Sequence, residues 1–367
     1  MSSNCGKLLK VQLFGESHGE AVGAVIDGFP AGFPVDMEKL QNFLNRRAAR
    51  LQIHTPRRET DVPRVLSGVY RGHTTGTPLA VLFENQAARP SDYEALADIP
   101  RPGHGDWPAM AHGFGFEDLR GGGHHSGRLT LPYCFAGGLA LQWLAARGVR
   151  VGAHLLSVGN IQDEGLDPMA PDFACLAACH ARPIPMLKES AAGAAFAALE
   201  EISSAGDSLG AVVECAADGL PAGVGEPYFD NMESLLSAQL FAIPGVKGVS
   251  FGEGFAAAGM KGSEYNDPYT LRDGNITPKS NHAGGLLGGM TDGAPILLQA
   301  AFRPTASIRK EQITARLDGG ECTLSIQGRH DPCVALRAVP VVESAVALVL
   351  MDALLERMAR TGNEGKL

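Results

Sequence analysis

Glycine is the feature of this sequence that most constrains its fold. The chain has 367 residues and 46 of them are glycine, about 12.5%, against roughly 7% in an average protein. They follow no collagen-like period, so they do not indicate a fibre. Because glycine weakens helix and strand interiors but suits tight turns and close backbone approaches, the sequence predicts many turns between short elements.

Length and charge narrow the class of protein. The chain is longer than the roughly 250–300 residues at which a single core usually stops growing, and its 45% apolar content supports a folded core. Its net charge of −9 disfavours general nucleic-acid binding. The best apolar run, Ala345–Met351, is much shorter than a membrane helix, and Met1–Lys10 lacks the apolar stretch of a signal peptide. We therefore expect a cytoplasmic protein with no membrane partner and no nucleic-acid partner.

The sequence lacks the patterns that are typical of several kinds of functional site. The 7 cysteines are scattered without a C-x-x-C pair, which is typical of reduced thiols. Cys175, Cys179 and His180 lack the rest of a metal site, and the neighbouring His124 and His125 point apart on an extended segment, so we expect no metal. The hydrolase pattern G-x-S-x-G and the phosphate-loop pattern G-x-x-x-x-G-K-[ST] are also absent.

Two pairs of segments are similar at long range. Gly23–Gly32 resembles Gly210–Gly223, and Gly72–Leu79 resembles Gly289–Ile296, in the same order along the chain. We predict one domain over residues 1–367, built from two pseudo-symmetric halves of about 1–150 and 205–357, with a frayed tail at 361–367. The alternative is that glycine and proline turns look alike by chance.

Local patterns predict a mixed fold of helices and strands, with residues 158–187 connecting the halves. The expected helices are 36–50, 132–147, 188–204, 231–242 and 343–360, and the expected strands are 8–14, 78–83, 210–215 and 296–302.

Histidine and arginine gather in the glycine-rich turns. Such turns expose backbone N–H groups, and arginines beside them can clamp phosphate, so we expect an anionic small-molecule ligand. The alternatives are a solvated helix end for Arg46, Arg47 and Arg50, a surface position for His104, and a linker role for Gly121–Gly123. The turns are Gly15-Glu16-Ser17-His18-Gly19, Arg101-Pro102-Gly103-His104-Gly105-Asp106, Arg120-Gly121-Gly122-Gly123-His124-His125-Ser126-Gly127-Arg128, Ser280-Asn281-His282-Ala283-Gly284-Gly285 and Gly328-Arg329-His330-Asp331-Pro332.

Together with Arg337-Ala338-Val339-Pro340, these turns resemble the chorismate synthase family from Gly6 to about Leu355. The resemblance implies an α/β (α+β) sandwich of antiparallel sheets and helices in two pseudo-symmetric halves, assembled as a cytoplasmic homotetramer. It also implies the anti-1,4-elimination of phosphate from 5-enolpyruvylshikimate 3-phosphate to chorismate, with reduced FMN and no net redox change. The sequence departs from the common family pattern at His124 and His125, which replace Arg and Ser, and at Arg303, where Lys is frequent.

The resemblance also implies roles for individual residues. His104 would protonate reduced flavin, His18 would assist the departing phosphate, Asp331 would assist proton removal from C6, and Ser17 and Ser126 would hold this relay. The implied substrate clamps are Arg46, Arg47, Arg128 and Arg337. The implied FMN contacts are His124, His125, Ser126, Pro244, Gly245, Gly288, Arg303, Pro304, Thr305, Ala306, Ser307 and Arg329.

Other functions remain open at this point. The chain could be an FMN-dependent enzyme acting on a different phosphorylated acid, or a non-catalytic FMN- or phosphate-binding homologue. A pure binding protein needs no proton relay, so His18, His104 and Asp331 argue against the second. No G-x-G-x-x-G fingerprint follows a strand, so we expect an external flavin reductant.

Overall fold

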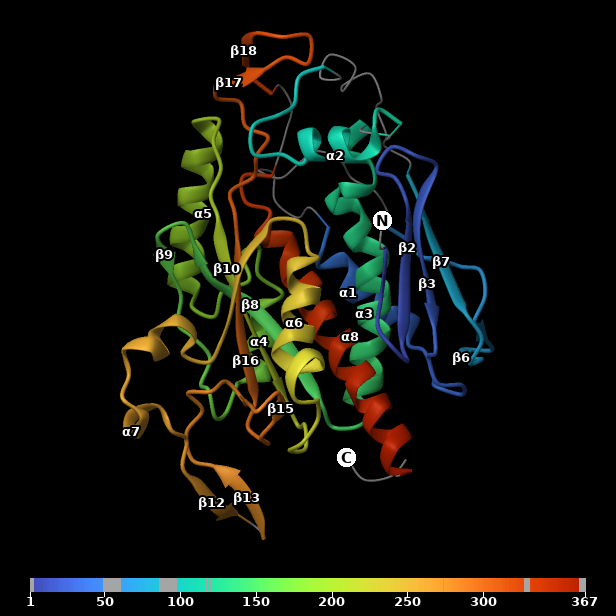
Figure 1. Ribbon diagram of the computed structural model, residues 1–367, viewed down its shortest axis with the longest axis vertical. Coiled ribbons are helices and arrows are strands. Elements are labelled where there is room, and N and C mark those ends of the chain that lie inside the picture. The colour runs from blue at the N-terminus through green and yellow to red at the C-terminus, as the bar shows by residue number, and fades with distance from the viewer. Residues whose placement is uncertain are drawn as a thin grey trace.

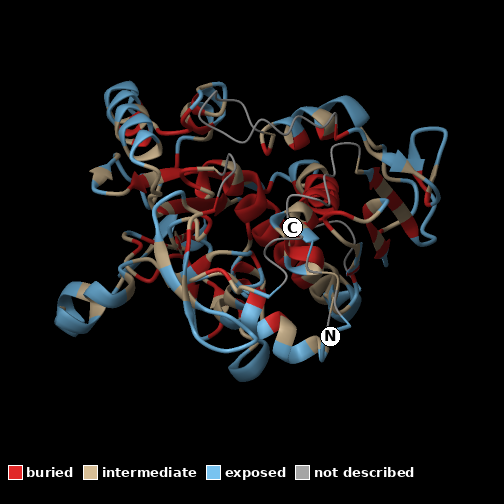
Figure 2. Ribbon diagram, turned by 90° about the horizontal axis from the view of Figure 1, so that it is seen from above, coloured by how far each residue is buried: buried red, intermediate tan, exposed pale blue. Residues whose placement is uncertain are grey.

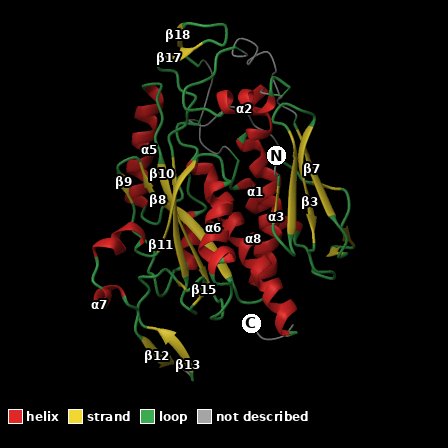
Figure 3. Cartoon of the chain, viewed as in Figure 1, coloured by secondary structure: helices red, strands yellow, loops and turns green. Residues whose placement is uncertain are grey.

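The fold places helices between two antiparallel sheets. The computed structural model describes residues 3–48, 61–85, 98–116, 118, 120–272, 274–326 and 331–362. Within those ranges two five-stranded sheets lie on either side of a central layer of helices, as Figures 1 and 3 show. This arrangement confirms the expected α+β sandwich.

The first sheet uses the N-terminal part of the chain. Its inner face is apolar because side chains alternate along β7, where Leu79, Val81 and Phe83 are buried. The pairing of β2 with β3 sets Phe14 opposite Gly23, whose missing side chain leaves room for the Phe14 ring. The strand order is β1 (Asn4–Cys5), β2 (Lys10–Gly15), β3 (Ala21–Asp27), β7 (Leu79–Glu84) and β4 (Arg64–Val65).

The second sheet is covered on both faces. Helix α4 packs against β8 on one side and α8 packs against it on the other. Consequently β8 shows no alternation of buried and exposed residues, which is why sequence patterns did not identify it. The order is β11 (Val246–Phe251), β16 (Ile296–Phe302), β10 (Ala211–Asp218), β8 (Arg150–Val158) and β9 (Ile161–Gln162).

Helices α3 and α8 form the centre of the core, where the buried residues concentrate in Figure 2. They approach closely because Gly137 lacks a side chain: a Cβ there would lie 2.2 Å from Cβ of Ser344. The expected helices at 36–50, 132–147, 188–204 and 231–242 correspond to α1, α3, α5 and α6. The helices are α1 (Met37–Asn45), α2 (Asp106–Gly113), α3 (Thr130–Ala145), α4 (Phe173–Cys179), α5 (Glu189–Ser204), α6 (Met232–Phe241), α7 (Gly262–Tyr265) and α8 (Ala335–Thr361).

Helix α8 corrects two expectations. It begins at Ala335 rather than at Glu343, because Pro340 is accommodated inside it. Its 27 residues are long and apolar enough to cross a membrane, whereas the sequence analysis found no such run, but 94% of the apolar window is buried inside the fold. It is therefore a core helix. Near its end, Asp352 accepts hydrogen bonds from the backbone amides of Lys7 and Leu9, both at 2.7 Å.

The remaining elements are short and lie around the sandwich. Short 3-10 helices occur at Gly127–Leu129, Tyr228–Asp230 and Gly254–Gly259, and Arg120–His125 is an irregular turn. Residues 363–367 of the expected frayed tail lie outside the described ranges. The hairpins are β5 (Val69–Tyr70) with β6 (His73–Thr74), β12 (Tyr269–Arg272) with β13 (Asn275–Pro278), β14 (Leu286–Leu287) with β15 (Met290–Thr291), and β17 (Gln312–Ala315) with β18 (Glu321–Leu324).

The segments that are similar in the two halves of the sequence make matching contacts in the structure. The Thr74 hydroxyl donates to the Pro30 carbonyl at 2.6 Å, and the Thr291 hydroxyl donates to the Pro221 carbonyl at 2.7 Å. In each half the strand before the turn (β3 or β10) pairs with the strand after the hairpin (β7 or β16). These contacts support the pseudo-symmetry, which stays a prediction for the halves as a whole.

Candidate active site

The glycine run Gly121–Gly123 wraps around the end of β2. All three glycines have positive φ, at 61°, 87° and 51°, which side chains disfavour. A Cβ on Gly121 would lie 2.1 Å from Cε1 of His18, so only glycine lets the buried His18 ring occupy this position. The Ser17 amide donates to the Gly123 carbonyl at 3.1 Å. The run therefore fixes Ser17 and His18 against one loop.

The same glycine run also lies close to His104, which comes from another part of the chain. A Cβ on Gly122 would lie 3.6 Å from Cε1 of His104 and 3.7 Å from Cβ of Ser126. His104 sits in the turn before α2, where its Nδ1 lies 2.7 Å from Oδ1 of Asp106. The structure thus brings His18, His104 and Ser126 together, although 86 residues of sequence separate the two histidines (104 − 18).

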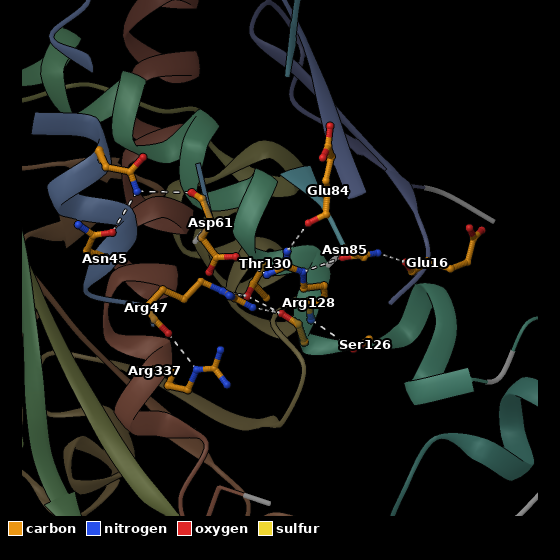
Figure 4. Close-up of polar contacts among 12 residues, drawn as sticks. Glu16, Asn45, Arg47, Asp61, Glu84, Asn85, Ser126, Arg128, Thr130 and Arg337 are labelled. Atoms are coloured by element: carbon orange, nitrogen blue, oxygen red, sulfur yellow. Dashed lines mark hydrogen bonds and ion pairs between the residues drawn. The ribbon is translucent and has the colours of Figure 1, made fainter. Parts of the chain in front are cut away.

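A cationic cluster lies beside the following turn, and Figure 4 shows its contacts. Arg47 is 4% exposed, and it donates from Nε to the Thr130 hydroxyl at 2.7 Å and from Nη2 to the Gly127 carbonyl at 2.5 Å. Its buried Nη1 has no hydrogen-bond partner within the described part of the chain. Burial, and next the charge of Arg337, lowers the pKa of Arg47 to about 10, so it stays cationic at neutral pH.

Arg337 joins this cluster from α8. Its Nε donates to the Arg47 carbonyl at 2.9 Å, and its Nη1 lies 3.0 Å from Oδ2 of Asp331. Asp331 and Arg337 therefore come together with Arg47 at the start of α8. An unpaired N–H group on a buried guanidinium is suited to an incoming anion, because a charge-assisted hydrogen bond would complete it.

Arg128 connects the cationic cluster to the His18 turn. Its Nη1 pairs with Oδ1 of Asp61 at 2.5 Å, and its Nε donates to Oδ1 of Asn85 at 3.0 Å. The Asn85 amide in turn donates to the carbonyls of Glu16 and Gly19 at 3.0 and 2.9 Å. Asn85 thus ties Arg128 to both ends of the turn that carries Ser17 and His18.

Comparison with known proteins identifies the family. The family model described as chorismate synthase matches residues 9–355. The chain belongs to the chorismate synthase family. Chorismate synthases of Thermococcus kodakarensis, Pyrococcus abyssi and Lancefieldella parvula are 44%, 43% and 42% identical to it, covering 97%, 96% and 96% of this chain and 99%, 97% and 96% of theirs. A crystal structure of chorismate synthase shares the fold, with a TM-score of 0.76 at 24% identity over 96% of this chain and 94% of that one.

Some residues implied by the chorismate synthase resemblance lie next to the His104 turn. Nη1 of Arg101 lies 3.3 Å from Oγ of Ser307, and a Cβ on Gly103 would lie 3.7 Å from Cβ of Ala306. The Arg303 amide donates to the Gly245 carbonyl at 2.9 Å, which attaches the Pro244-Gly245 turn to the segment Arg303-Pro304-Thr305-Ala306-Ser307. The buried Thr305 hydroxyl has no partner among the described residues.

A cavity of about 620 Å³ adjoins this region, a size typical of small-molecule sites. His124, His125, Ser126 and Pro244 line it. The volume of the cavity and its mixture of aromatic, apolar and polar lining side chains fit a planar ligand of the size of FMN. Arg329, another implied FMN contact, lies outside the described residues.

Three implied residues are not brought to the site in the expected way. Arg46 turns to α8 and forms a two-fold ion pair with Glu343 at 2.7 and 2.8 Å, so it is not part of the Arg47 cluster. Gly288 lies far from the Arg337 end of α8. The next residue, Gly289, packs against Glu226, and Glu226 pairs with Arg360 near the C-terminal end of α8. The rise of an α-helix puts Arg360 about 35 Å from Arg337.

His124 is the third. Its Nδ1 lies 2.9 Å from the Gly15 carbonyl, which can only accept, so Nδ1 donates and Nε2 accepts from the Ser3 hydroxyl at 2.8 Å. Both ring nitrogens therefore hold the N-terminal segment against β2. These two hydrogen bonds give a structural explanation for His instead of Arg at position 124. With both ring nitrogens occupied, a flavin could contact only the face or the edge carbons of this ring.

Sequence reasoning missed four residues that hold the site: Thr130, Asp61, Asn85 and Asp106. Only Asp106 carried a signal, since it closes the Arg101–Asp106 turn. The others contact arginines from distant parts of the chain, and no local pattern marks them.

Proposed function

We propose that this chain catalyses the anti-1,4-elimination of phosphate from 5-enolpyruvylshikimate 3-phosphate to give chorismate. Family membership supports the reaction and its substrate. The structural observation that carries most weight is that two histidines meet at one glycine run, with a buried cationic cluster beside the turn that follows it. A departing phosphate dianion needs positive charge and a proton donor, which these residues supply.

The arginines bind the substrate in this proposal. Arg47 offers its Nη1 to the phosphate or a carboxylate, and Arg337 and Arg128 add charge on either side. Arg337 also orients Asp331, which assists proton removal from C6. His18, covered by the glycine run, protonates or hydrogen-bonds the leaving phosphate, and Ser17 and Ser126 hold the relay in place.

Reduced FMN, when bound, supplies an electron-rich ring that donates charge transiently to the carbon from which phosphate departs. Arg303, Thr305 and Ser307 would hold it beside the His104 turn, with His125, Ser126 and Pro244 on the cavity side. His104 holds the proton for the reduced ring. We also propose a cytoplasmic homotetramer and an external flavin reductant.

The experiment is an anaerobic assay with purified protein, chemically reduced FMN and 5-enolpyruvylshikimate 3-phosphate. We expect chorismate and phosphate in equal amounts. If reduced FMN binds but neither product appears, the chain acts on a different phosphorylated acid or is a binding protein. Replacing chemical reduction by oxidised FMN with NADPH tests the reductant: product formation would show that the chain reduces its own flavin.

His104→Ala should lower turnover about 10²–10⁴-fold, the usual weight of one general acid or base. His112→Ala is the matched control, because His112 is an exposed histidine in the helix that follows the His104 turn, α2. Equal turnover in the two variants would remove His104 from the mechanism.

A further inference from the structure

The buried carboxylate of Asp106 stands between His104 and an arginine. Asp106 is 6% exposed, and its Oδ1 lies 2.7 Å from Nδ1 of His104. Arg101 grips both carboxylate oxygens, from Nε to Oδ2 at 2.6 Å and from Nη2 to Oδ1 at 2.8 Å. The Arg101 amide adds a third bond to Oδ2 at 3.2 Å. The carboxylate is thus fixed in position by the turn that carries the histidine.

The charge of this carboxylate decides where the His104 proton lies. Burial acts to raise the pKa of Asp106, but the hydrogen bonds and charges of Arg101 and His104 outweigh it and hold the pKa well below its usual value. An ionised carboxylate can only accept a hydrogen bond. Arg101 Nη2 also lies 3.1 Å from His104 Nδ1, and it carries two hydrogens, one of which it donates to Oδ1 at 2.8 Å. An Nδ1 without hydrogen would nevertheless place its lone pair 2.7 Å from a carboxylate oxygen that has no hydrogen to give, whereas an Nδ1–H donates to it. Nδ1 therefore carries hydrogen and donates to Asp106.

The other ring nitrogen faces the candidate site. A Cβ on Gly122 would lie 3.6 Å from Cε1 and 3.9 Å from Nε2 of His104, while Ser126 approaches the same point at 3.7 Å. The Cε1–Nε2 edge is consequently turned towards the glycine run, and the Nδ1 edge is turned towards Asp106.

We propose that Asp106 is a positioning residue that holds His104 in the Nδ1–H form, so that Nε2 is the atom that exchanges a proton with the ligand. Arg101 keeps the carboxylate in place, and through Ser307 it links this pair to the segment 303–307. The catalytic meaning of the proposal rests on the proposed function, in which Nε2 of His104 takes up a proton, with the resulting imidazolium stabilised by Asp106, and passes it to the reduced cofactor. The tautomer itself does not depend on that function.

The first test is ¹⁵N NMR of the ligand-free protein with ring-labelled histidine at mildly alkaline pH. The His104 signals are assigned by their loss in His104→Gln. We expect a protonated Nδ1 and an unprotonated Nε2 in the wild-type protein. A protonated Nε2 would overturn the proposal whether or not any variant folds.

The second test is Asp106→Asn. Its amide oxygen would accept from Arg101 and its NH₂ would face His104 Nδ1, so the proton should move to Nε2 and the two ¹⁵N signals should exchange character. The same carboxylate-to-amide change beside a catalytic histidine costs serine proteases about 10⁴ in kcat through the wrong tautomer. We expect kcat to fall about 10²-fold or more here, with KM nearly unchanged.

Asp218→Asn is the matched control. It also removes a carboxylate from an arginine, because Arg150 Nη2 lies 2.6 Å from Asp218 Oδ2, but it has no contact with His104. The proposal would be overturned if the folded Asp106→Asn protein kept the wild-type ¹⁵N signals of His104. It would also be overturned if Asp106→Asn and Asp218→Asn lost kcat equally. If the assay shows no chorismate synthesis at all, the proposed function fails while the tautomer result still stands.

Discussion

Two consecutive arginines at the end of α1 have opposite environments. Arg46 meets the carboxylate of Glu343, whose side chain is 2% exposed, in a two-fold ion pair. Arg47 is buried beside the start of α8, but among the described residues its side chain donates only to a hydroxyl and a carbonyl, and the charge of Arg337 helps to lower its pKa. Within the part of the chain that the structure describes, Arg46 has a carboxylate partner and Arg47 has none, so Arg47 is suited to pairing with an anionic ligand.

This difference shows that burial alone does not distinguish an arginine that stabilises the fold from one that binds a ligand. A buried arginine that is paired is part of the fold, whereas a buried arginine among cations destabilises the fold unless an anion binds. Stability given up at such a position is typical of functional sites. The following predictions separate the two cases, from the largest expected effect to the smallest.

Arg46→Met should lower the free energy of unfolding by about 3–5 kcal/mol, because it leaves the Glu343 carboxylate buried without a counter-charge. Urea denaturation measures the loss. The double variant Arg46→Met/Glu343→Gln should recover much of it, since no lone charge remains. A stable Arg46→Met protein with a greatly raised KM would contradict the comparison and restore Arg46 as a substrate clamp.

Arg47→Met should leave the free energy of unfolding unchanged or higher, and should raise KM for the substrate. A hydrogen bond to a charged group is worth about 1.5–3 kcal/mol, so the expected rise is about 10–150-fold. Steady-state kinetics and urea denaturation on the same preparation test both statements. Arg47→Lys keeps the charge and should lose less affinity. Strong destabilisation of Arg47→Met, with KM unchanged, would mean that Arg47 is structural like its neighbour.

Inorganic phosphate should stabilise the wild-type protein modestly. At ten times its Kd a single bound phosphate adds about 1.4 kcal/mol, which for a chain of this size is a rise in Tm of roughly 2 °C. Differential scanning calorimetry measures it, with chloride at equal ionic strength as the control. The rise should persist in Arg46→Met and vanish in Arg47→Met. If both variants respond alike, phosphate binds elsewhere.

Local structure was predictable from sequence where its cause is local. The helix expected at 36–50 begins as α1 where a local cap is available, because the Asp36 side chain accepts a hydrogen bond from the Lys39 amide at 2.9 Å. The start of α8 was misplaced because Pro340 normally interrupts a helix. Here the helix continues through it, and the Ser344 hydroxyl donates to the Pro340 carbonyl at 2.7 Å.

The candidate site was predictable only in part. Glycine turns that carry histidine and arginine indicated which segments would gather, but not which partner each side chain would take. Arg46 and Glu343 are 297 residues apart, and nothing near either residue marks the pair. The same holds for Arg128 with Asp61. Long-range pairing decides whether an arginine binds a ligand, and one sequence alone does not contain it.

The central position of α8 has a consequence for the order of folding. The ribosome delivers this helix after every other described element, yet α8 packs against α3, α6, β8 and β10. Until it emerges, β8 and β10 lack the helix that covers most of their inner face, and Asp331 and Arg337 have not reached Arg47. Contacts between residues that are far apart in the sequence form slowly. Strands that stay exposed during that time are prone to aggregate. We therefore expect the nascent chain to stay prone to aggregation until its last long helix covers the core and brings Asp331 and Arg337 to Arg47.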